Sequence, residues 1–210
     1  RRLTAWPTAS PTPCATPGRV EAGELASAVA DQTMRYRVYL PPCYGDDGRV
    51  YPTLYLFGGN VHDETFWDRL GIDETAEAAI AAGRIPPLLI VMPDNGWLAN
   101  TTSSGPASYE GFVLNELLPH IESQYCAWPA REGRAVGGVS RGGYWSLMMA
   151  FRRPDLFRSA VRRGGGGEDH AALRGLQKAR DRHVQVGVHV APPVLDDDHR
   201  AVGQIADALA

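Results

Sequence analysis

A serine between two glycines is the feature of this sequence best suited to chemistry. Residues 138–142 read Gly-Val-Ser-Arg-Gly and fit the pattern G-x-S-x-G, between an expected strand (133–140) and an expected helix (142–154). Such a strand-to-helix turn strains the serine backbone and lifts its hydroxyl clear of the sheet, while the small glycines let strand and helix pack closely. The pattern predicts that Ser140 is a nucleophile. An incidental serine in a Gly-rich turn is the alternative.

The helix expected after the serine would add electrostatic stabilisation. Because it begins at about Arg141, its free backbone N–H groups and the positive end of its dipole would face the reacting oxygen.

Apolar segments of two kinds alternate along the chain and predict an α/β fold. Short, nearly continuous apolar runs that stop at glycine or proline are typical of buried parallel strands, and longer runs with helical spacing follow them. Alternating strands and helices favour a mainly parallel sheet flanked by helices. Strands are expected at 33–42, 51–59, 86–96, 133–140 and 183–194, and helices at 66–85, 109–126, 142–154, 170–182 and 196–210.

Four of these blocks together resemble one known family. Residues 51–67 (YPTLYLFGGNVHDETFW), 86–96, 109–126 and 133–157 are similar, in order and spacing, to the α/β-hydrolase esterase family that includes esterase D, feruloyl and enterochelin esterases and the mycolyltransferases. The resemblance covers residues 33–161. It implies an α/β-hydrolase fold, a Ser-His-Asp triad, an acyl-enzyme on Ser140 and carboxylic esters as substrates, without a cofactor.

The resemblance also implies an oxyanion hole, the pair of N–H donors that stabilises the charged intermediate. One donor would be the backbone N–H of Arg141, and the second would come from the loop after the strand at 51–59. The family usually has H-G-x-G-G there, whereas this chain has Gly58-Gly59-Asn60-Val61-His62. Because the donors are backbone groups, the hole can survive this change, and the N–H of Asn60 is the candidate.

The acid and base of the triad are ambiguous, because two registers fit the C-terminal segment. In the first register Asp198 is the acid and the base lies beyond residue 210. In the second, 183–194 is the last strand and His199 is the base, with Asp169 or Asp181 as the acid. Asp198 and His199 are chain neighbours and therefore alternatives, not a working pair. The last 50 residues depart from the family pattern, which indicates a truncated or divergent C-terminal part.

Two other readings stay open beside the esterase. The mycolyltransferase branch would use the same serine to pass an acyl group to an alcohol. Loss of the base would instead leave a non-catalytic binding or surface protein on a hydrolase fold. Tyr144, Trp145, Trp67 and Trp97 are candidate pocket aromatics, although core packing is an equal alternative for Trp145.

Composition narrows the class of protein. With 44% hydrophobic residues the chain can bury a sizeable core, and a net charge of −3 does not favour nucleic acid as a partner. No apolar run approaches the roughly 20 residues of a membrane span. No metal site is expected, since Asp196, Asp198 and His199 have no second ligand cluster nearby in the sequence. The expected partner is a small-molecule or polysaccharide-linked ester.

The first residues suggest an exported protein. Residues 1–18 are rich in proline, threonine and serine, as in segments that follow a removed export signal, so we expect an extended arm there and a hydrolase domain over 19–210. The expected location is secreted or on the cell surface. Three cysteines (Cys14, Cys43 and Cys126) allow one disulfide after export, with one thiol left free, and three unpaired thiols are the alternative.

Overall fold

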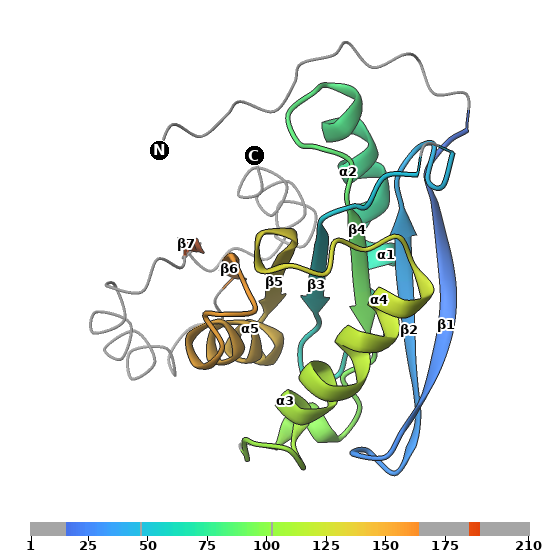
Figure 1. Ribbon diagram of the computed structural model, residues 1–210. Helices are drawn as coiled ribbons and strands as arrows, with labels where there is room; N and C mark the ends of the chain where they lie inside the picture. Colours follow the sequence, from blue (N-terminus) through green and yellow to red (C-terminus); the bar gives the residue numbers. More distant parts are fainter. Residues whose placement is uncertain (1–15, 47, 102, 164–184, 190–210) are drawn as a thin grey trace.

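The computed structural model describes residues 16–46, 48–101, 103–163 and 185–189, and these form one mixed sheet with helices on both faces (Figure 1). The strand order is β1-β2-β4-β3-β5-β6-β7. β1 and β2 pair antiparallel, β2 pairs antiparallel with β4, and every later pair is parallel. The predicted α/β-hydrolase fold is therefore confirmed. The strands are β1 (Arg19–Ser27), β2 (Gln32–Leu40), β3 (Thr53–Phe57), β4 (Leu89–Pro93), β5 (Arg134–Val139), β6 (Ser159–Arg163) and β7 (Gln185–His189).

The central strands are apolar throughout because both faces of the sheet are covered. Every residue of β3 and β4 is buried. Along β3, Tyr55 and Phe57 pack into one core, whereas Leu54 and Leu56 pack into the other. This alternation explains why a continuous apolar run predicts a strand in such a fold.

The two cores lie under different helices. Residues of α3 (Tyr109–Phe112), α4 (Leu118–Gln124) and α5 (Arg141–Arg152) pack with Tyr55 and Phe57 on one face. Residues of α1 (Phe66–Arg69) and α2 (Ile72–Ala81) pack on the opposite face. Figure 1 shows α4 in front of β2 and β4. None of the helices that the structure describes has the length and apolar character needed to cross a bilayer.

Two predicted helices are interrupted for identifiable reasons. The helix expected at 66–85 divides at Gly71, whose φ of 76° is left-handed, so α1 ends and α2 begins there. The helix expected at 109–126 contains a π-helical segment, Val113–Leu117, between α3 and α4. Pro119 is the second residue of α4, and its missing N–H and its ring disrupt the regular hydrogen-bond ladder of the preceding turn.

The outer strand β1 was not predicted, and it closes one side of the sheet. Among the described residues β1 pairs with β2 alone. The turn between them is held by Glu116, whose carboxylate accepts hydrogen bonds from the Ser27 hydroxyl and from the N–H groups of Ala28 and Val29. Most of the expected arm (1–15) lies outside the described residues, so the domain division at residue 18 stays a prediction.

Of the cysteines in the described part, Cys43 is disulfide-bonded and Cys126 keeps a free thiol. The structure therefore has the alternative with one disulfide rather than three unpaired thiols.

Candidate active site

Ser140 lies at the junction of β5 and α5 in a strained backbone conformation. Its φ of 51° and ψ of −118° lie outside the regions that residues with a side chain ordinarily adopt. The residue is exposed, although Gly138 before it and Gly142 after it are buried. Strain of this kind persists only where the surrounding structure enforces it. The strand, the turn and the helix are thus arranged as the G-x-S-x-G pattern predicts.

The two glycines are needed because backbone presses on them from both sides. A Cβ atom at Gly142 would lie 2.4 Å from the carbonyl oxygens of Phe57 and Gly58. A Cβ atom at Gly138 would lie 2.7 Å from the carbonyl oxygen of Phe57 and 2.5 Å from the carbonyl carbon of Gly142. Real Cβ atoms do not approach backbone so closely. The end of β3 therefore packs directly on the serine turn.

The loop after β3 lies beside Ser140 because β3 and β5 are parallel neighbours. Phe57 pairs with Gly138, so the chain leaves both strands at the same edge of the sheet. A Cβ atom at Gly59 would lie 3.7 Å from the Cβ of Ser140. The Arg141 side chain donates from Nε to the Asn60 Oδ1 at 3.3 Å. The two predicted oxyanion residues, Asn60 and Arg141, are thus side by side and flank Ser140.

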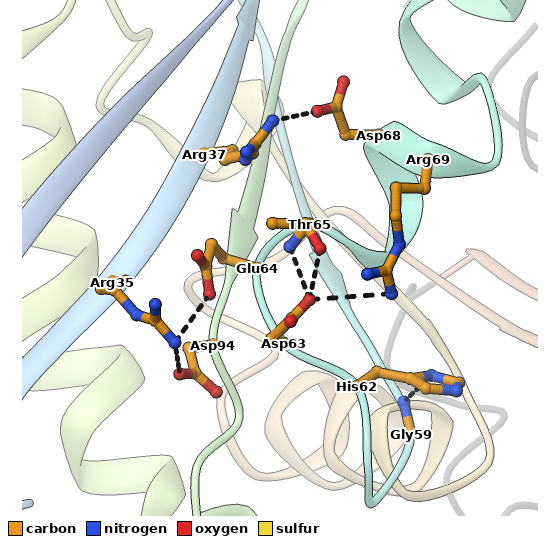
Figure 2. A network of polar contacts seen from close by, with 10 residues as sticks. All are labelled: Arg35, Arg37, Gly59, His62, Asp63, Glu64, Thr65, Asp68, Arg69 and Asp94. Atoms are coloured by element: carbon orange, nitrogen blue, oxygen red, sulfur yellow. Dashed lines mark hydrogen bonds and ion pairs between the residues drawn. The ribbon is translucent and has the colours of Figure 1, made fainter.

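His62 is part of this loop and was not assigned a role from the sequence. Its Nδ1 accepts a hydrogen bond from the backbone N–H of Gly59 at 2.9 Å (Figure 2). The ring also stacks on Phe66, with 3.5 Å between ring centroids. His62 therefore stabilises the conformation of this loop. Because the N–H of Gly59 is bonded to His62, it is not free to bind a ligand, unlike the next N–H, that of Asn60, which no described residue accepts.

A polar network ties the remainder of the loop to β2 and α1 (Figure 2). Arg35 of β2 forms ion pairs with Glu64 at 3.5 Å and Asp94 at 3.4 Å. Arg37 pairs with Asp68 of α1. Asp63 accepts hydrogen bonds from the Thr65 hydroxyl and N–H, which lower the pKa of the Asp63 carboxyl. The loop that carries Asn60 is thus fixed at its far end.

Of the four candidate pocket aromatics, two belong to the core. Trp145 is fully buried and donates from Nε1 to the carbonyl of Ala99 at 2.8 Å. Trp67 is also buried. A pocket role for these two is therefore wrong, because both indoles pack inside the protein. Trp97 is 59% exposed and Tyr144 is half-buried, with the Arg141 guanidinium over its ring.

The predicted acid and base lie outside the described residues. This holds for Asp198 and His199 and for the alternative acids Asp169 and Asp181, so their roles stay predictions. In the described part of the chain, no group of three histidine, cysteine or acidic side chains could hold a metal ion.

Comparison with known proteins assigns this chain to a family. Residues 27–165 match the family described as "Putative esterase". The chain belongs to this esterase family. Over 135 residues it is 41% identical to Esterase Rv1288 of Mycobacterium tuberculosis, an alignment that covers 61% of this chain and 28% of that protein. It is 32% identical over 131 residues to an endo-1,4-beta-xylanase/feruloyl esterase of Xylanibacter ruminicola, covering 57% of this chain and 18% of that protein.

Solved structures support the same fold. A ferulic acid esterase superposes with a TM-score of 0.75 at 20% identity, covering 92% of this chain and 98% of that chain. The S-formylglutathione hydrolase of Staphylococcus aureus superposes with a TM-score of 0.72 at 14% identity, covering 91% and 98% of the two chains. The esterase matches span under a third of the two curated relatives' own lengths, so those relatives contain much more than the part shared with this chain.

Proposed function

We propose that this protein is a serine hydrolase that cleaves carboxylic esters through an acyl-enzyme on Ser140. The strained and exposed Ser140, at the N-terminus of a helix and beside the Gly59–Asn60 loop, is the observation that carries the proposal. Membership of the esterase family and the hydrolase fold of the structural relatives support it.

Each group near Ser140 has a separate part in the proposed reaction. The Ser140 Oγ attacks the ester carbonyl carbon, and the C=O electrons move onto oxygen to form a tetrahedral oxyanion. The N–H of Arg141, in the first turn of α5, donates to this oxyanion together with the N–H of Asn60. The intermediate collapses with departure of the alcohol and leaves an acyl group on Ser140. Water then attacks the acyl group and releases the acid.

A base must accept the serine proton, because a hydroxyl is a poor nucleophile without one. We assign this step to the C-terminal segment, with His199 as the base in one register and Asp198 as the acid in the other. His62 and His120, which precede Ser140 in the chain, each have another partner. His62 accepts from the Gly59 N–H, and His120 is hydrogen-bonded to the Tyr36 hydroxyl at 2.8 Å.

The substrate class follows from the relatives. A xylanase/feruloyl esterase and a ferulic acid esterase are among them, so we propose a small-molecule or polysaccharide-linked ester as substrate. The same relatives, together with the Pro/Thr/Ser-rich first 18 residues, support an extracellular or surface location.

Hydrolysis of a short nitrophenyl ester by the unaltered chain and by Ser140→Ala tests the proposal. We expect turnover to fall to background in Ser140→Ala while the far-ultraviolet circular dichroism spectrum is unchanged. A fluorophosphonate probe should label the unaltered chain at Ser140, as located by peptide mass spectrometry. Equal turnover in both proteins, or absence of labelling, would contradict the proposal, and absence of labelling would favour a non-catalytic binding protein. Ester products made from an added alcohol would instead indicate an acyltransferase.

A further inference from the structure

Asn95, the second residue after β4, is a buried polar residue that the proposed chemistry does not use. Only 1% of its surface is exposed. A buried amide is costly unless its donors and acceptor are paired, and this one is paired on both sides. Its Nδ2 donates to the carbonyl oxygens of Gly58 at 2.5 Å and Gly59 at 3.1 Å, and its Oδ1 accepts from the Tyr109 hydroxyl at 2.8 Å.

The Gly59 carbonyl matters because it shares a peptide unit with the N–H of Asn60. The described chain has no cis peptide, so the C=O and the N–H of this unit point in opposite directions in one plane. The Asn95 amide holds the carbonyl end of the unit inside the protein, and the backbone N–H of His62 donates to the same carbonyl at 3.2 Å. The N–H end therefore points away from Asn95 and out of the core. It belongs to the loop that flanks the exposed Ser140.

The hydrogen bonds of the loop leave the N–H of Asn60 available as a donor but not the N–H of Gly59. The N–H of Gly59 is donated to the Nδ1 of His62. No described residue accepts the N–H of Asn60, although the adjoining Asn60 carbonyl accepts from Asn100 at 3.2 Å. Of the two peptide units that Asn95 holds, only the second therefore offers a donor to a ligand.

Tyr109 fixes which way the Asn95 amide faces. Its hydroxyl donates to Oδ1, so Nδ2 must face the two carbonyls, and the reversed amide would set oxygen against oxygen. Tyr109 is fully buried and contacts the rings of Phe57 and Trp145. The orientation of Asn95 is thus set by a rigid part of the core.

We propose that Asn95 is a positioning residue, anchored by Tyr109, that aims the Gly59–Asn60 peptide so that its N–H donates to the oxyanion. This inference depends on the proposed function, since it assigns a role within the same reaction.

The test uses Asn95→Asp, which keeps the shape of the side chain but sets carboxylate oxygens against two carbonyls. Loss of one oxyanion donor typically lowers the rate by ~10²–10³. We expect Asn95→Asp to lower kcat for a short nitrophenyl ester by about 10-fold to 100-fold, with KM changed less than about 3-fold, because a turned donor is weakened rather than lost. The rate of fluorophosphonate labelling at Ser140 should fall in parallel.

Asn100→Asp is the matched control. Asn100 also donates its amide to a carbonyl of this loop, that of Asn60, but it is exposed and its bond holds the following peptide unit. Its kcat should remain within about 3-fold of the unaltered chain.

Tyr109→Phe keeps the ring in the core and removes only the hydroxyl that orients Asn95, so it tests the proposal even if Asn95→Asp does not fold. We expect about a 3-fold to 10-fold lower kcat, with KM unchanged. An unaltered kcat in folded Asn95→Asp or in Tyr109→Phe would overturn the role of Asn95. If the unaltered chain is not labelled at Ser140, the proposed function itself fails. If the unaltered chain is labelled at Ser140 and the variants are labelled at the same rate, only the positioning role of Asn95 is rejected.

Discussion

The backbone of Gly142 lies directly against the carbonyl oxygen of Gly58, where a Cβ atom at 142 would be 2.4 Å from that oxygen. The first turn of α5 and the loop after β3 therefore meet without intervening side chains. This contact brings the two proposed oxyanion donors together, although they lie 81 residues apart in sequence.

Gly142→Ala should disrupt both stability and catalysis, because its methyl group would push the Gly58 loop away from Ser140. Overpacking of this kind costs about 1–3 kcal/mol in unfolding free energy. Gly137→Ala is the matched control in the same segment, since its methyl would first meet the end of the Leu56 side chain, at 3.2 Å, and no backbone atom closer than 3.5 Å. Thermal melting and nitrophenyl ester turnover measure the two effects. An active, fully stable Gly142→Ala would show that this contact is unimportant.

Ser140→Gly should be more stable than Ser140→Ala, although both lose the proposed nucleophile. Glycine accepts a φ of 51° with a ψ of −118°, whereas alanine keeps the Cβ that makes this conformation costly. Strained positions of this type cost about 1–3 kcal/mol, part of which the greater chain entropy of glycine offsets. Urea unfolding of the two variants gives the difference. Equal free energies of unfolding would mean that the turn is not strained.

Glu122→Gln should destabilise the fold through Arg134. The Glu122 carboxylate accepts two hydrogen bonds from the Arg134 guanidinium, at 2.6 and 3.0 Å, and both side chains are largely buried. Removing one charge of a fully buried pair costs roughly 3–5 kcal/mol, so we expect about 1–3 kcal/mol for this partly hydrated pair. Asp155→Asn breaks the similar but exposed pair with Arg153 and should cost under about 0.5 kcal/mol. Denaturant unfolding gives the free energy of unfolding of both variants. Equal losses of this free energy in the two variants would contradict the prediction.

His120→Gln should make the protein less sensitive to acid. Burial lowers the pKa of His120 below its usual value near 6.5. Between the lowered pKa and about 6.5 the unfolded chain binds more protons than the folded chain, so stability falls as the pH falls through this range. Glutamine cannot gain this charge and can still bond to the Tyr36 hydroxyl. As the pH is lowered from 8 to 5, the melting temperature of the variant should therefore fall less than that of the unaltered chain. An equal fall in both proteins would contradict the prediction.

The parallel centre of the sheet and the edge strand β7, which lies within the strand expected at 183–194, could be predicted from sequence, whereas β1 and β6 could not. Every residue of β3 and β4 is buried, and β5 is buried from Val136 to Gly138, which gives these strands a distinctive apolar and Gly-rich composition. β1 lies at an edge, so Glu21 and Glu24 can alternate with apolar residues there, and its pattern resembles a loop. In β6 the apolar pair at 160 and 161 is too short to distinguish a strand from the basic segment around it.

At the site, Ser140 and Gly142 were predictable because local geometry demands their residue types. Asn95 was not, because its partners Gly58 and Gly59 come from the loop after β3, and nothing local shows that its side chain is buried. Its only sequence feature was an amide placed just after a buried strand. The break at Gly71 and the π-helical turn before Pro119 carried a local cue, a glycine and a proline inside helical patterns.

The character of β1 also bears on how the protein behaves when concentrated. Along this rim the charged side chains of Arg19 and Glu21 are 47% and 40% exposed, and Glu24 is exposed as well. A strand of another molecule that paired with β1 would place its side chains next to these charges and partly remove them from water. Charged edge strands therefore oppose the pairing of sheets between molecules. Crowded solutions of this chain should therefore resist fibril formation along the β1 side.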